Sequence, residues 1–89
     1  MKEIILDCAE ITDKKQLHEL IAEGLQFPDW YGGNLDALYD CLTGVYDETH
    51  IVLKDFAKLK ANLGSYALSV RKVLLKADED NERITAVIE

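Results

Sequence analysis

Three short apolar runs, widely spaced along the chain, restrict the possible folds more than any other feature of the sequence. They lie at residues 4–6, 51–53 and 84–88; the last is interrupted by Thr85 and is rich in β-branched residues. Runs of this length suit buried strands, and each gap between them is long enough for two helices. Strands joined by long helical connections pair in parallel, with right-handed crossovers. We therefore predict a small two-layer α/β domain of order βααβααβ, with sequential strand neighbours in a three-stranded parallel sheet and helices mainly on one face.

The predicted helices are marked by residues that typically begin and end them. Asp13, with Gln16 three residues later, resembles a capping box. Residues 25–33 contain Pro28 and two consecutive glycines, which predict an irregular loop. Each helix follows a side chain whose oxygen can accept a hydrogen bond from a helical N–H group, namely Asp13, Asn34, Asp55 and Ser65. The first three helices are predicted to end at glycines, namely Gly24 in the left-handed conformation, Gly44 and Gly64.

Length and composition place the chain among small globular domains and exclude several other classes. The 89 residues are interpreted as one domain, residues 1–89, and 48% hydrophobic residues suffice for one small core. No apolar run exceeds three residues, which excludes a transmembrane helix and the hydrophobic region of a signal peptide. In the absence of an export signal, Cys8 and Cys41 predict free thiols in a reducing cytoplasm.

The acidic charge of the chain is concentrated in one segment. The chain has 17 acidic and 10 basic residues, and its net charge is −7. Between Gln16 and Leu53 there is no Lys or Arg, whereas the rest of the chain is neutral. The seven acidic residues of this segment are Glu19, Glu23, Asp29, Asp36, Asp40, Asp47 and Glu48. The segment is either an ordinary solvated surface or a surface for a basic partner, and its charge disfavours direct binding of nucleic acid.

The second predicted helix separates an apolar stripe from an acidic face. On a helical wheel the stripe spans about 60°, and its members are Leu35, Leu38 and Leu42. The solvent side carries Asp36, Asp40 and Thr43, with Tyr39 at the border. An acid in the first turn complements the helix dipole, which explains Asp36 but not Asp40. Like charges at i and i+4 also destabilise a helix slightly, so the pair is a candidate binding site.

The loop before this helix adds aromatic side chains to the acidic face. Trp30 and Tyr31 are adjacent, and Gly32 and Gly33 follow them. Two neighbouring rings cannot easily both point inward, so we expect one in the core and one on the surface. An exposed ring beside paired carboxylates is typical of a protein–protein interface.

The run from Pro28 to Gly44 reads Pro-Asp-Trp-Tyr-Gly-Gly-Asn-Leu-Asp-Ala-Leu-Tyr-Asp-Cys-Leu-Thr-Gly. It closely resembles the barstar family of intracellular inhibitors of barnase-type ribonucleases. The core Tyr-Gly-x-Asn-Leu-Asp-Ala-Leu-x-Asp is specific to that family, and chain length and element order fit from end to end. The resemblance implies a protein, not an enzyme, that blocks the cationic active site of a small basic secreted ribonuclease. It implies a monomer that forms a 1:1 complex without cofactor, metal or membrane.

The resemblance also assigns partner-binding residues. The positions that match the family pattern are Tyr31, Asn34, Leu35, Asp36, Asp40, Thr43 and Gly44. Asp40 would replace a substrate phosphate among cationic groups of the ribonuclease, and Asp36 would pair at the rim. The chain departs from the pattern at Trp30, Tyr39, Val45 and Lys76, which are included among the predicted contacts. Val45 lacks the aromatic ring of the pattern, and Lys76 replaces an acid. These two departures concern which ribonuclease is the target, and not the type of interaction.

Alternative functions remain open from the sequence. Asp36 and Asp40 could hold Mg²⁺ in a phosphoryl hydrolase, although no Lys or Arg lies nearby in the sequence to bind the phosphate. A regulatory module that binds another basic protein is the second alternative. The third is a Cys–His nucleophile, although neither His18 nor His50 has a partner at ligand spacing.

Overall fold

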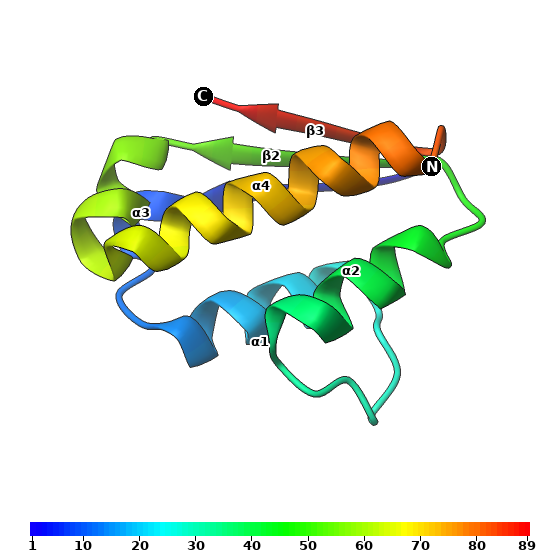
Figure 1. Ribbon diagram of the computed structural model, residues 1–89, viewed down its shortest axis with the longest axis horizontal. Coiled ribbons are helices and arrows are strands. Elements are labelled where there is room, and N and C mark those ends of the chain that lie inside the picture. The colour runs from blue at the N-terminus through cyan, green and yellow to red at the C-terminus, as the bar shows by residue number, and fades with distance from the viewer.

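The computed structural model describes all 89 residues and confirms the predicted order of elements (Figure 1). The three strands are β1 (Lys2–Asp7), β2 (Thr49–Lys54) and β3 (Ile84–Ile88). The four α-helices are α1 (Lys14–Leu25), α2 (Leu35–Thr43), α3 (Phe56–Leu63) and α4 (Ser65–Asp80). A short 3-10 helix, η1 (Cys8–Glu10), was not predicted. The strands pair in parallel in the order β1-β2-β3, as the sequence predicts.

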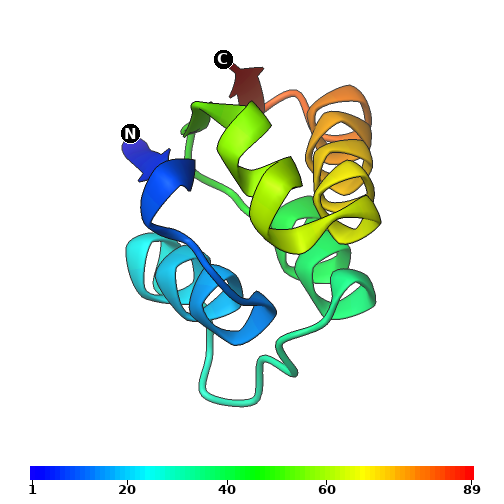
Figure 2. The same ribbon diagram turned by 90° about the vertical axis from the view of Figure 1, so that its left-hand side faces the viewer.

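The helices cover one face of the sheet, and the other face is open (Figure 2). In β1 the side chains of Ile4 and Leu6 are buried, whereas that of Ile5 between them is exposed. The register places Ile5 opposite Val52 and Val52 opposite Val87. The period of two in the strands therefore sends one set of side chains into the core and leaves the other outside.

The core lies between the sheet and the helices. Leu38 and Leu42, from the predicted stripe of α2, are fully buried. α2 packs against α4, and α1 packs against β1. Burial of these apolar stripes holds the helices on the sheet, and it leaves the opposite face of α2 in solvent. No helix combines the length and the hydropathy that crossing a bilayer requires.

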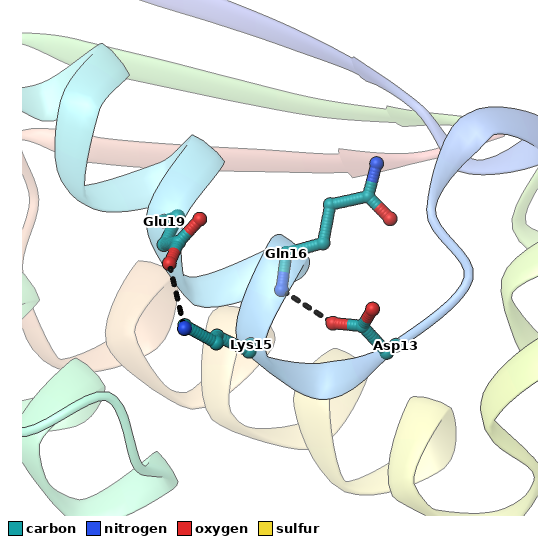
Figure 3. Close-up of polar contacts among 4 residues, drawn as sticks. All are labelled: Asp13, Lys15, Gln16 and Glu19. Carbon is teal, nitrogen blue, oxygen red and sulfur yellow. Dashed lines mark hydrogen bonds and ion pairs between the residues drawn. The ribbon is translucent and has the colours of Figure 1, made fainter.

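The start of α1 confirms part of the predicted capping box (Figure 3). The Asp13 carboxylate accepts a hydrogen bond of 2.7 Å from the Gln16 backbone N–H. The Gln16 side chain does not return to Asp13; its oxygen accepts from the Thr12 N–H at 2.9 Å, and its amide donates to the Glu10 carbonyl. Gln16 therefore joins η1 to α1. The adjacent Lys15–Glu19 pair, at 3.9 Å, is exposed and contributes little stability.

The prediction that Gly24 ends the first helix is wrong. The helix continues to Leu25, and Gln26 takes the left-handed conformation with φ 57°. A β-carbon on Gly24 would lie 2.7 Å from Cγ2 of Ile4. Gly24 is therefore needed where α1 approaches β1, and the predicted loop begins one residue later, because Leu25 is buried in the helix.

One predicted N-cap is wrong, and another is confirmed in position only. Asp55 is the N-cap residue of α3, but its backbone is left-handed, with φ 61°, and its side chain makes no capping hydrogen bond. Ser65 is the first residue of α4, and Gly64 occupies the cap position. Gly64, with φ 61°, is the only residue between α3 and α4. The start of α4 therefore has no preceding residue in the extended conformation that could cap it with a side chain. The predicted helix ends at Gly44 and Gly64 and the N-cap at Asn34 are confirmed.

Candidate partner-binding surface

The outer face of α2 carries the two carboxylates that the sequence singled out. The Asn34 side chain caps the helix by accepting from the Ala37 N–H at 2.8 Å. Asp36, Asp40 and Thr43 are exposed, as the helical wheel predicts. Neither carboxylate has an ion-pair partner, because the two ion pairs of the chain lie elsewhere. The Thr43 hydroxyl donates to the Tyr39 carbonyl at 3.0 Å and so faces its own helix. The face therefore presents two uncompensated negative charges one turn apart.

The two rings of the preceding loop point in different directions, which confirms the prediction. Trp30 is 75% exposed. Tyr31 is half-buried against the core, with its ring centroid 5.0 Å from that of Phe27. Its hydroxyl lies 2.5 Å from Nδ1 of His18. Tyr31 therefore anchors the loop, and Trp30 is the ring that it offers to solvent.

A buried histidine connects this loop to two helices. His18 of α1 is only 3% exposed, and its Nε2 lies 2.6 Å from the hydroxyl of Tyr66 on α4. A neutral imidazole has one donor and one acceptor nitrogen, which suits two hydroxyl partners. Burial lowers the pKa of His18 and raises the pKa of Tyr31 and Tyr66. The network is therefore uncharged at neutral pH, and it holds the loop, α1 and α4 together.

α2 and α4 are also joined at the surface. The Tyr39 hydroxyl donates to the Asp80 carboxylate near the end of α4. The Lys76 ammonium lies 3.4 Å from the other oxygen of Asp80. The bond from Tyr39 is the main cause that lowers the pKa of Asp80, and the charge of Lys76 adds to it. Lys76 is thus one side chain away from the outer border of α2, and a carboxylate of its own helix partly offsets its charge.

Some predicted contact residues lie beneath the surface and fix the position of the end of α2. Leu35 and Val45 are half-buried and pack against the core. Asn81, which follows α4, donates to the carbonyls of Leu42 at 3.0 Å and Val45 at 3.3 Å. Gly44 is the C-cap of α2. The end of α2 and the residues after it are therefore held in place by α4.

Two hollows flank the loop. The larger, of roughly 680 Å³, lies between α1 and the loop, and both His18 and Tyr31 line it. The smaller, of roughly 360 Å³, lies where the loop meets the end of α2, and Trp30 and Asp40 border it. Both hollows therefore adjoin the candidate surface.

The cysteines and possible metal ligands lie apart from one another. Cys8 and Cys41 are free, and burial is the main cause that raises the pKa of both thiols. Cys8 is fully buried, whereas Cys41 is half-buried and borders the smaller hollow. No group of three or more His, Cys, Asp or Glu side chains is placed to hold a metal ion.

Sequence reasoning did not find several residues that position the surface. His18, Tyr66, Asp80 and Asn81 each act through a partner 13 to 48 residues away in the chain. The one local signal in the sequence is His18 itself, which stands among the apolar residues Leu17 and Ile21 of α1. The contacts of Tyr66, Asp80 and Asn81 depend on how the helices are arranged in space, which the sequence does not show.

The fold and this surface define a class: small α/β proteins with a three-stranded parallel sheet, covered on one face by helices, of which one presents an acidic outer face. The family model described as "Barstar (barnase inhibitor)" matches residues 1–89. A protein of Bacillus subtilis (strain 168) named "Putative ribonuclease inhibitor YrdF" is 44% identical over 81 residues, which are 90% of this chain and 89% of that protein. The chain belongs to the barstar family, which is a family of inhibitors and not of enzymes.

Proposed function

We propose that this protein inhibits a small basic secreted ribonuclease by covering its active site with α2 and the preceding loop. The observation that carries the proposal is the exposure of Asp36 and Asp40, one turn apart and without an internal cation. An active site that binds RNA phosphates is cationic, so it complements this face. Membership of the barstar family supports the same role.

In the proposed complex each group of residues has a distinct task. The Asp40 carboxylate occupies the place of a substrate phosphate among Arg and His side chains of the ribonuclease, and Asp36 pairs at the rim. The exposed Trp30 and the border residue Tyr39 supply aromatic contacts. The remaining predicted contacts, which shape or border this surface, are Tyr31, Asn34, Leu35, Thr43, Gly44, Val45 and Lys76. Inhibition is by occlusion and involves no covalent step.

The proposal includes a stoichiometry and a setting. One inhibitor binds one ribonuclease and buries roughly 800 Å² on each partner, the usual size of a stable interface. The free thiols Cys8 and Cys41 suit the cytoplasm, where the inhibitor would meet ribonuclease before secretion. Lys76 favours a target whose surface opposite α4 is less basic than the rest of its active site.

The test is a titration of the protein into barnase and other small secreted ribonucleases, followed by RNA cleavage. We expect activity to fall to zero at one equivalent for at least one enzyme, with and without EDTA, and the enzyme mass to be unchanged. The double variant Asp36→Asn/Asp40→Asn removes both charges but keeps the shape of the side chains. It should therefore lose inhibition. Inhibition that needs a divalent metal, or that leaves a modified enzyme, would contradict the proposal.

A further inference from the structure

The smaller hollow brings together the two most exposed aromatic side chains of the protein. It lies where the loop meets the end of α2, and Trp30 and Tyr46 both border it. Trp30 is 75% exposed and Tyr46 is 88% exposed. Tyr46 is not among the residues that the family resemblance assigns. Its ring does not contribute to the core, so its exposure has no explanation in the stability of the fold.

The residue before Tyr46 is held in place by the core and by the end of α4. Val45 packs against the core, and its carbonyl accepts a hydrogen bond from Asn81 at 3.3 Å. Tyr46 directly follows this fixed residue, and its side chain is exposed. Val45 lacks an aromatic ring, but Tyr46 supplies one at the same end of α2.

The charges around the hollow favour a cationic occupant. Asp40 and Asp47 both border it. Lys2 is the one basic residue in its lining, and the Lys2 ammonium is directed to the Leu25 carbonyl at 3.3 Å. Two carboxylates therefore meet two exposed rings in a space with a single, hydrogen-bonded cation. Carboxylates and aromatic faces together match a guanidinium group, which is planar, positively charged and able to stack.

We propose that this hollow receives an arginine side chain of the partner ribonuclease, and that Tyr46 is a specificity-determining residue of this chain. The inference rests on the proposed function and extends its surface beyond the residues of α2. The volume of roughly 360 Å³ lies at the lower end of the range for small-molecule pockets and suits one side chain. The Tyr46 and Trp30 rings contact the guanidinium, and Asp47 pairs with it.

Trp30 is the one tryptophan of the chain, so its fluorescence reports directly on the hollow. The probe is N-acetyl-arginine amide, titrated at constant ionic strength against the uncharged N-acetyl-citrulline amide. We expect a saturable change in emission with the arginine probe and at least about threefold weaker binding of the citrulline probe. Tyr46→Ala and Asp47→Asn should each weaken binding of the arginine probe by a similar factor. The matched controls, Leu75→Ala and Glu10→Gln, change exposed residues outside the hollow and should bind like the unmodified protein.

A second measurement tests whether the hollow contacts the ribonuclease in the complex. With barnase as the enzyme, Tyr46→Ala should weaken inhibition about tenfold through faster dissociation, whereas Tyr46→Phe, which keeps the ring, should retain it. Because Tyr46 is 88% exposed, both variants should fold. If the protein inhibits barnase but Tyr46→Ala changes neither inhibition nor the arginine titration, the inference is wrong and the proposed function stands. If no ribonuclease is inhibited but the arginine probe binds in a Tyr46-dependent way, the hollow is confirmed and the proposed function is wrong.

Discussion

Gly24 shows how much one missing side chain can matter where a helix crosses a strand. Alanine is a better helix former than glycine, so Gly24→Ala in an isolated helix would be stabilising by about 1 kcal/mol. Here the new β-carbon would lie 2.7 Å from Cγ2 of Ile4, and α1 would have to move away from β1. We expect the free energy of unfolding in urea to fall by about 1–3 kcal/mol. An exposed control, Glu23→Ala, should change it little, and a more stable Gly24→Ala variant would show that the contact is not tight.

The two carboxylates of α2 should affect binding unequally without affecting the fold. Both are exposed and unpaired, so Asp36→Ala and Asp40→Ala should melt like the unmodified protein, or slightly higher because repulsion is relieved. Asp40→Ala should weaken inhibition about thirtyfold or more, since cations of the ribonuclease would be left buried and unpaired. Asp36→Ala should have a smaller effect. Inhibition titrations and thermal melting measure both quantities, and a melting temperature that collapses would mean that the carboxylates are structural.

At the scale of elements, the His18 network should make the attachment of the loop depend on pH. The groups that face His18 are the hydroxyls of Tyr31 and Tyr66, and the Lys14 ammonium lies over the Tyr66 ring. Burial lowers the pKa of His18 in the folded protein below its ordinary value of about 6.5. The stabilisation from neutral His18 is therefore complete above about pH 6.5 and is lost as the pH falls toward the folded pKa.

Urea unfolding at a series of pH values tests this expectation. The free energy of unfolding of the unmodified protein should decrease between pH 7.5 and pH 5, because the unfolded chain takes up a proton that the folded chain excludes. His18→Gln removes the titrating group and keeps polar contacts for the two hydroxyls, so its curve should be flatter over this interval. Equal slopes for the two proteins would show that other groups determine the pH dependence.

The α2–α4 border should control which ribonuclease binds well. Lys76→Glu changes the local charge by two units beside Asp80. The new repulsion should lower the free energy of unfolding by a few tenths of a kcal/mol. Against barnase it should tighten binding, mainly by faster association, because a rim charge acts on the encounter. Lys72→Glu makes the same change one turn away and is the matched control. Stopped-flow rates that are the same for Lys76→Glu and the unmodified protein would place residue 76 outside the interface.

At the scale of the whole molecule, the net charge of −7 lies in a segment that includes α2 and its preceding loop. Such a separation of charge should steer a basic ribonuclease toward the candidate surface. Screening shortens the reach of these charges to about 10 Å at 0.1 M salt, so the association rate should fall roughly tenfold or more as salt rises. The dissociation rate should change much less. A flat salt dependence of association in stopped-flow measurements would contradict steering.

The sequence by itself determined the element order, the parallel sheet and the acidic face of α2. These features follow from signals that act within a few residues. The period of the apolar residues buries Leu38 and Leu42 and exposes Asp40, and the Asn34 side chain caps a helix that begins beside it. Adjacent rings at Trp30 and Tyr31 had to separate for the same local reason.

Only the tertiary structure decided what happens where elements meet. Gly24 lies within a helix, where the absence of a β-carbon lets α1 approach Ile4, whereas local rules predict a helix end. The partners of His18 are 13 and 48 residues away, and Tyr39 reaches Asp80 across 41 residues. Val45, which precedes the exposed Tyr46, packs against the core, and its carbonyl accepts a hydrogen bond from Asn81 beyond α4. Periodicity shows which face of an element is buried, but it does not show which residue of another element lies against that face, because that choice depends on the packing of the whole core.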